Sequence, residues 1–220
     1  MIQQTLIALS LLTSVNFTQF VTPSASLAEE RVLAKKDMYL TDRLPNEGGS
    51  QIFADNIVLS LHYLKGDVDS LKTTPAIVNE TSLDWQKVRA PFEVSFKLDK
   101  GEVFAFHNQT LPEYEGKIKV STNSKFYMQE GYKSLAGLGG NGVCHVASLI
   151  NWVAKDAGLN VVAKVNHDFW PVPNIPREYG TSIFSTMAEQ NLYIENTKDN
   201  PVEFDFKIKS DRITLSIKEV

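Results

Sequence analysis

The only cysteine in the sequence, Cys144, ends a glycine-rich stretch, GLGGNGVCH at residues 137–145. An apolar pattern with helical spacing follows, so we expect this thiol at the N-terminus of a helix over 143–157. The unpaired N–H groups and the positive dipole end there favour thiolate over thiol and lower a cysteine pKa. The glycines let the backbone approach a substrate, and free N–H groups could hold an oxyanion. The residue types therefore indicate a nucleophilic thiol.

A nucleophilic cysteine needs a base, and His167 is the candidate. It follows LNVVAKV at residues 159–165, a β-branched stretch that predicts a strand returning along the helix. Seven strand residues span about 23 Å, roughly the length of a helix of about 15 residues, so His167 is expected beside Cys144. His145 is a competing base. Because adjacent helix residues rarely face one another, we expect it to line the pocket or donate to an oxyanion.

The same residues also have plainer interpretations. A lone cysteine is most often a small buried hydrophobe, the glycine loop is then a tight connection, and His167 is a strand-end residue that faces water. The other histidines, His62 and His107, are scattered along the chain. Since the sequence has neither HExxH nor paired CxxC spacing, we expect no metal site, and nothing in it calls for a cofactor.

Composition limits the classes of partner. The chain has 220 residues, of which 22 are Lys or Arg and 26 are Asp or Glu, for a formal net charge of −4. This charge argues against nucleic acid, which needs a basic face. No apolar run approaches the length of a membrane span. With 43% hydrophobic residues, a sizeable core is feasible.

Periodicity predicts an α+β fold, in which a largely antiparallel sheet packs on a central helix that starts at the glycine-rich loop with Cys144. A short helix is expected over 56–64, ended by Gly66. Strands are expected from alternation and β-branched content. Their ranges are 92–98, 102–106, 117–120, 159–165, 191–196, 202–209 and 212–218.

The N-terminal region divides into two segments. Residues 1–28 contain a short apolar run and small residues at Ser26 and Ala28 that suit signal peptidase, but they lack a basic start. They are either a signal segment or an ordinary apolar segment, which places the protein in the cell envelope or outside the cell, or else in the cytoplasm. Residues 29–54 are polar, with LPNEGG at 44–49, and are expected to be a linker or arm. One domain is expected over 55–220.

The stretch GLGGNGVCHVASLINWVAKDAGL, followed by VNHDFWPVP, resembles the VanW-like family, whose motif core would cover residues 92–219. The family motif reads Gly-Gly-Gly-[Val/Ile]-Cys-Gln-Val-[Ser/Ala] and opens a helix that ends in Ala-Gly-Leu, with a later histidine followed by prolines. GEVFAF at 101–106 and LYIENTKDNPVEF near the C-terminus resemble further family segments. The matching positions are Gly139, Gly140, Gly142, Val143, Cys144, Val146, Ala147, Ala157, Gly158, Leu159 and His167.

This resemblance implies a bacterial cell-wall protein, because the family is named for an accessory gene of vancomycin-resistance clusters. Some members resemble L,D-transpeptidases in action, forming a cysteine acyl-enzyme with peptidoglycan stem peptides. Carried over, Cys144 is the nucleophile and His167 the base. The oxyanion or substrate-lining residues are Gly140, Gly142, Val143, His145, Asp168 and Trp170. The aromatic residues Trp152, Phe169, Trp170 and Tyr179 are expected to line a peptide groove or to be core.

Three departures from the family pattern bear on the chemistry. The motif glutamine after the cysteine is His145 here, one motif glycine is replaced by Asn141, and an aspartate of many members falls on Gly180. Asp168, Asn166 or a backbone carbonyl would then have to orient His167. The alternatives left open are a transpeptidase, a thiol hydrolase acting on another amide, and a non-catalytic module that binds cell-wall peptide or glycopeptide.

Overall fold

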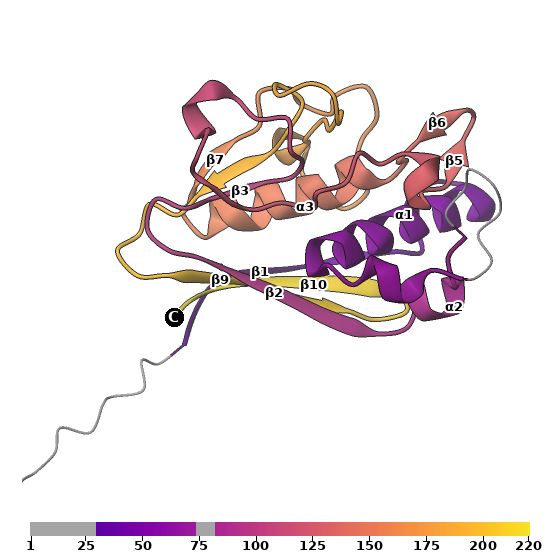
Figure 1. The fold of residues 1–220 in the computed structure, drawn as a ribbon, viewed down its shortest axis with the longest axis horizontal. Coiled ribbons are helices and arrows are strands. Elements are labelled where there is room, and N and C mark those ends of the chain that lie inside the picture. The colour runs from indigo at the N-terminus through magenta and orange to yellow at the C-terminus, as the bar shows by residue number, and fades with distance from the viewer. Residues whose placement is uncertain (1–29, 74–81) are drawn as a thin grey trace, which may run out of the picture.

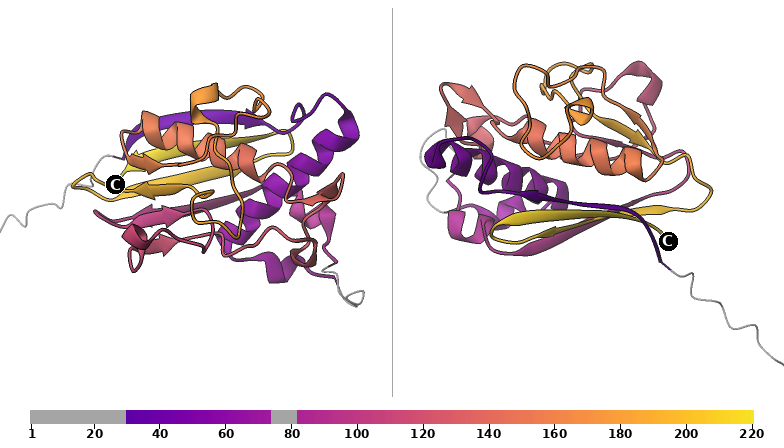
Figure 2. Two further views of the ribbon diagram at one scale, coloured as in Figure 1. Left: turned by 90° about the horizontal axis from the view of Figure 1, so that it is seen from above. Right: turned by 180° about the vertical axis from the view of Figure 1, so that it is seen from behind.

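The computed structural model describes residues 30–73 and 82–220. They form two four-stranded sheets. Helices α1 (Glu47–Lys65) and α3 (Val143–Asp156) cover one face of the first sheet, and the second sheet lies on the far side of α3 (Figure 1). Figure 2 shows the same layering from above and from behind. The class is therefore α+β, as the periodicity predicts.

The first sheet is antiparallel, in the order β1-β10-β9-β2. Its strands are β1 (Arg31–Tyr39), β2 (Phe92–Leu98), β9 (Val202–Ile208) and β10 (Arg212–Glu219). Alternation in β9 turns Val202, Phe204, Phe206 and Ile208 inward, and all are buried. Phe96 of β2 stacks on Phe204 with ring centroids 4.6 Å apart.

The second sheet has the order β4-β3-β8-β7, and only its β3–β4 pair is parallel. Its strands are β3 (Val103–Ala105), β4 (Ile118–Val120), β7 (Asn160–Val162) and β8 (Tyr193–Glu195). A hairpin of β5 (Ser134–Leu135) and β6 (Leu138–Gly139) precedes α3. Short helical turns complete the order: η1 (Val68–Leu71), α2 (Trp85–Val88), η2 (Pro112–Tyr114), η3 (Met128–Glu130) and η4 (Arg177–Tyr179).

The linker expected at residues 29–54 is wrong for the described part of that segment. β1 pairs with β10 along its length, and α1 begins at Glu47, nine residues before the helix expected at 56. β1 was missed because it is polar: it lies at the sheet edge, and of its side chains only Met38 is fully buried. Its strand conformation comes from backbone pairing with β10. Asn46 caps α1 by accepting the N–H of Gly49 at 2.6 Å.

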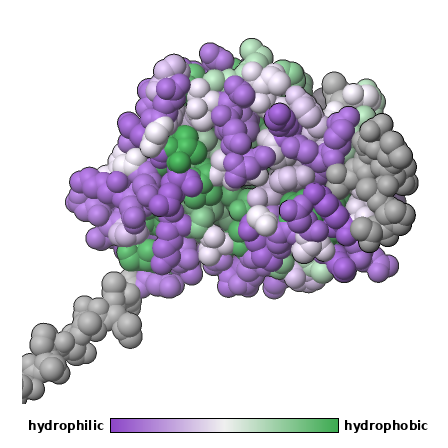
Figure 3. Space-filling model, in the orientation of Figure 1, coloured by the Kyte–Doolittle hydropathy of each residue, from purple (hydrophilic) through white to green (hydrophobic). Residues whose placement is uncertain are grey.

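Helix α3 lies between the two sheets and contacts β1 and β10 on one side and β7 on the other. Its buried face includes Val146, Leu149, Ile150 and Val153. The face of the molecule in Figure 3 is mostly hydrophilic, with hydrophobic patches between the polar side chains. No helix in residues 30–73 and 82–220 has the length and hydropathy needed to cross a membrane. The predicted signal segment, 1–28, lies outside the described residues.

Candidate functional site

The glycine loop positions α3 by allowing a close approach to α1. Gly142, the N-cap residue of α3, has φ 98°, a conformation that favours glycine. A Cβ at this position would lie 2.6 Å from the carbonyl oxygen of Phe53 in α1. A Cβ at Gly140 would lie 2.9 Å from the Cβ of Phe126. The start of the helix that carries Cys144 is thereby fixed against its neighbours.

Cys144 and His167 line the same cavity, of about 320 Å³. The cavity lies where α3 begins, and the chain between β7 and β8 forms its other wall. Its lining residues are Phe53, Gly139, Gly140, Asn141, Gly142, Cys144, His145, His167, Phe169, Ser182, Ile183, Phe184 and Gln190. The structure thus brings together five of the predicted site residues: Gly140, Gly142, Cys144, His145 and His167.

The thiol of Cys144 is held by the backbone of Ile183. The N–H of Ile183 donates to Sγ at 3.3 Å, and the residue keeps part of its surface exposed. Burial of the thiol raises its pKa to about 11. The helix N-terminus was expected to lower this pKa, but desolvation of the thiolate outweighs the dipole and the Ile183 N–H. In the resting site, Cys144 is a neutral thiol.

His167 is oriented by a backbone carbonyl. Its Nδ1 lies 2.9 Å from the carbonyl oxygen of Trp170. Because a carbonyl only accepts, Nδ1 carries the proton and Nε2 keeps its lone pair. Burial lowers the pKa of His167, so the ring is neutral near pH 7. Within the described residues no hydrogen bond joins His167 to Sγ of Cys144.

Asp168 and Trp170 do not line the cavity with their side chains. Asp168 is exposed, and its carbonyl accepts a hydrogen bond from Arg177. The side chain of Trp170 is half exposed, and its role at the site is the carbonyl that orients His167. Phe169, in contrast, lines the cavity, with its ring centroid 4.2 Å from that of His167.

Backbone N–H groups were expected to hold an oxyanion at residues 143–145, and two of the three are already engaged. The N–H of Val143 donates to the carbonyl of Gly140 at 3.1 Å, and that of His145 donates to Gly142 at 2.9 Å. The N–H of Cys144 is the backbone donor that remains among them. An oxyanion here would need a second donor from a side chain.

His145, whose side chain lines the cavity, is a candidate for that donor. It is 1% exposed, and its ring lies 6.0 Å from that of His167 at an interplanar angle of 85°. On its other side it contacts the ring of Phe53 at 5.0 Å. Burial first, then the positive charge of Arg43, lowers the pKa of His145 to about 3. The ring is therefore neutral at every physiological pH.

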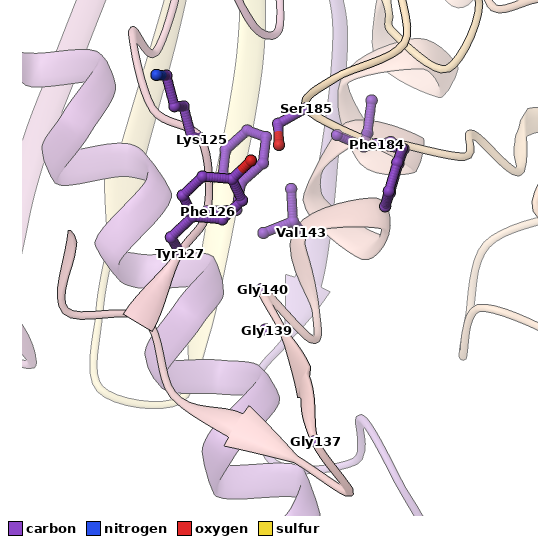
Figure 4. Close-up of a pocket in the computed structure, with 10 residues that line it drawn as sticks. Lys125, Phe126, Tyr127, Gly137, Gly139, Gly140, Val143, Phe184 and Ser185 are labelled. Carbon is purple, nitrogen blue, oxygen red and sulfur yellow. The ribbon is translucent and has the colours of Figure 1, made fainter. Parts of the chain in front are cut away.

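Val143 faces a second hollow, of about 200 Å³ (Figure 4). Tyr127 and Phe184 stand on opposite sides of this hollow, with Val143 between them. Lys125 lies at its rim. The two hollows adjoin, because four residues line both of them. These shared residues are Gly139, Gly140, Ile183 and Phe184.

The other aromatic candidates lie elsewhere. Trp152 and Tyr179 stack on each other with centroids 5.7 Å apart, and neither lines the cavity. Sequence reasoning missed several residues of the site, which come from segments with no motif. These are Phe53, Ser182, Ile183, Phe184 and Gln190. Among the described residues, no group of three His, Cys, Asp or Glu side chains is arranged to hold a metal ion.

The protein thus has an α+β fold in which Cys144 and His167 line one cavity, and a backbone carbonyl orients the histidine. Residues 95–218 match the family described as VanW like protein. Since the match spans more than half of the 220 residues, the chain belongs to the VanW-like family. Comparison with curated proteins and with solved structures finds no match. Phe53 and Arg43 lie outside the matched range.

Proposed function

We propose that this chain acts on peptidoglycan stem peptides in the cell envelope, by L,D-transpeptidase-like acyl transfer through Cys144. The observation that carries the proposal is the shared cavity: the only thiol lies in it together with His167, whose Nε2 is free to accept a proton. A link to vancomycin resistance, for which the family is named, belongs to the same proposal.

The chemistry balances with these two side chains. Sγ of Cys144 attacks the carbonyl carbon of a stem-peptide amide while Nε2 of His167 takes the thiol proton. An Sγ–C bond forms, the C–N bond breaks, and His167 returns the proton to the leaving amine. A second amine then attacks the thioester and releases the thiol, which gives a crosslink. Attack by water gives a carboxypeptidase instead.

Cys144 and His167 are both neutral before substrate binds, so the thiol becomes reactive only when its proton is removed. Burial raises the pKa of Cys144 and lowers that of His167, so an ion pair does not form in advance. Proton transfer must accompany attack on a bound carbonyl. Such a site is inert toward bulk reagents and acts on a substrate that fills the cavity.

The two adjoining hollows suit a peptide. Four residues line both hollows: Gly139, Gly140, Ile183 and Phe184. A peptide that crosses these shared residues therefore has space for its side chains in a hollow on each side. Phe184 is 54% exposed and presents an apolar surface at the junction. We assign the two hollows to the two sides of the amide that is attacked.

A non-catalytic peptide-binding module is the second candidate, and a specific observation favours it. The thiol of Cys144 is bound by the N–H of Ile183 and its pKa is raised to about 11, as for a structural cysteine. In this alternative the same cavity holds a cell-wall peptide without chemistry.

Intact-protein mass spectrometry with a tetrapeptide-containing muropeptide tests the proposal. The wild type should form an acyl adduct on Cys144, and Cys144→Ala should not. Replacing the base in His167→Gln should slow adduct formation by about 10²–10⁴-fold. His107→Gln is the matched control, because His107 is buried, its pKa is also lowered, and it does not line the cavity.

Calorimetric binding to the same muropeptide separates the two candidates. A wild type that binds it as tightly as Cys144→Ala but forms no adduct would establish the binding module and refute acyl transfer. If neither protein binds, both candidates fail. Where an adduct forms, adding an amine acceptor distinguishes a transpeptidase from a hydrolase.

A further inference from the structure

The cavity contains two neutral histidines with different surroundings. His167 presents Nε2 as an acceptor, because its Nδ1–H is bound to the carbonyl of Trp170. His145 lines the same cavity, but its Nδ1 is buried and has no hydrogen-bond partner. The nitrogen of His145 that a ligand can reach is therefore Nε2. Whether Nε2 donates or accepts depends on what faces Nδ1.

A second buried side chain, Arg43, also has polar atoms without a hydrogen-bond partner. Arg43 is 0% exposed, and its Nε and Nη1 have no acceptor. Its Nη2 donates to Asp42 at 2.7 Å. A guanidinium can only donate, so it needs acceptors. An unprotonated Nδ1 of His145 is an acceptor that needs a donor. Leaving both groups unpaired would be costly, since buried polar groups are almost always hydrogen-bonded.

The loop that holds Arg43 packs against the wall of the site. Asp42 accepts a hydrogen bond from Asn174, at 2.7 Å, in the proline-rich segment that follows His167. The N–H of Arg43 donates to Ser50 in the first turn of α1, the helix whose Phe53 contacts the ring of His145. Burial, and after it the positive charge of Arg43, lowers the pKa of His145, so the two groups interact electrostatically.

We propose that Arg43 is a positioning residue that donates to Nδ1 of His145 through one bridging water and so holds this ring as the Nε2–H tautomer. The two histidines of the cavity then have opposite tautomers. His167 presents a lone pair and is a base, and His145 presents an N–H and is a donor.

This arrangement supplies the second donor that the site requires. With the N–H groups of Val143 and His145 engaged, Nε2–H of His145 joins the N–H of Cys144 in holding the carbonyl oxygen of a bound amide. This last step rests on the proposed function, whereas the tautomer of His145 does not.

Long-range ¹H–¹⁵N correlation of the imidazole rings, on the full chain at pH 7.5, tests the proposal. The four histidines are assigned with single His→Gln variants. In the wild type, the unprotonated nitrogen, which resonates far downfield, should be Nδ1 in His145 and Nε2 in His167. A protonated Nδ1 in His145 overturns the proposal, and this measurement needs no variant.

Arg43→Met and Arg43→Lys then test the role of the arginine. In Arg43→Met, the two ring nitrogens of His145 should move toward a common shift as the tautomers mix, and its pKa should rise toward the ordinary value. Arg43→Lys should preserve the wild-type pattern, because an ammonium also only donates. His167 is the internal control and should not change. An unchanged His145 in a folded Arg43→Met overturns the role of Arg43. Opposite tautomers in a protein that forms no acyl adduct would refute the proposed function alone.

Discussion

His145→Gln should make the protein less sensitive to acid. The folded pKa of His145 is about 3, against an ordinary value of 6.5, chiefly because burial disfavours the charged ring; Arg43 and His167 lower it further, and Asp42 opposes them. Between these two pH values the unfolded chain binds a proton that the folded chain excludes. Stability is therefore complete above pH 6.5 and is lost as the pH falls toward 3.

The magnitude follows from the size of this shift. At pH 5 the unfolded histidine is mostly protonated and the folded one is not, so titration of this residue costs about 2 kcal/mol of unfolding free energy. Glutamine has no such titration. Between pH 7.5 and 5.0 the wild type should therefore lose about 2 kcal/mol more than His145→Gln, roughly 4–8 °C in melting temperature for a chain of this size.

Urea unfolding at the two pH values measures this difference. Both proteins carry the other buried histidines, whose contributions cancel when the two losses are compared. Between pH 7.5 and 8.5 the two stabilities should stay parallel, because neither form of residue 145 titrates there. Equal losses in the two proteins on going to pH 5.0 would refute the buried, neutral state of His145.

Three further predictions concern the thiol and its supports. With a pKa of about 11, about one Cys144 thiol in 10⁴ is ionised at pH 7. Iodoacetamide should therefore alkylate the native protein about 100-fold more slowly than the urea-unfolded chain. Rapid alkylation of the native protein would contradict the buried thiol. Gly142→Ala places a Cβ 2.6 Å from the Phe53 carbonyl oxygen at φ 98°, so it should lower the free energy of unfolding in urea by about 3 kcal/mol or more. Gly137→Ala, at φ 81° with no atom within 4 Å of the new Cβ, should lower it by about 1 kcal/mol. Equal losses in the two variants would argue against the close approach. Asn56→Ala removes three hydrogen bonds to the backbone of the loop around the site and should cost about 3 kcal/mol; a loss below 1 kcal/mol would show that the loop does not depend on them.

Local patterns were sufficient to predict much of the fold. The alternation at residues 92–98 predicted β2 with its observed bounds, and apolar spacing predicted α3 to within one residue at its end. β1 was missed, because its conformation depends on pairing with β10, which is far away in sequence. The strand predicted at 159–165 is shorter, Asn160–Val162, since the chain leaves the sheet to form the wall that holds His167.

Some residues of the candidate site are marked by a local sequence pattern, and others reach it only through tertiary packing. Cys144, His145 and His167 lie on or beside one helix–strand unit, and the structure places all three in the lining of one cavity. Arg43, Phe53 and Ile183 reach the site only through tertiary packing, and no local pattern marks them. The direction of the Cys144 pKa shift was also out of reach, because it depends on how much water the folded chain excludes.

The pairing of β1 with β10 bears on which part of the chain a fragment needs in order to keep the pocket. The segment that matches the family starts at residue 95, in the middle of β2, and it omits β1 and α1. A fragment with those limits would leave β10 without its outer neighbour, uncover the α1-facing side of α3, and remove Phe53 from the cavity. The matched segment is thus smaller than the set of elements that pack around the pocket. A fragment that is meant to keep this pocket therefore needs β1 and α1 as well as the matched segment.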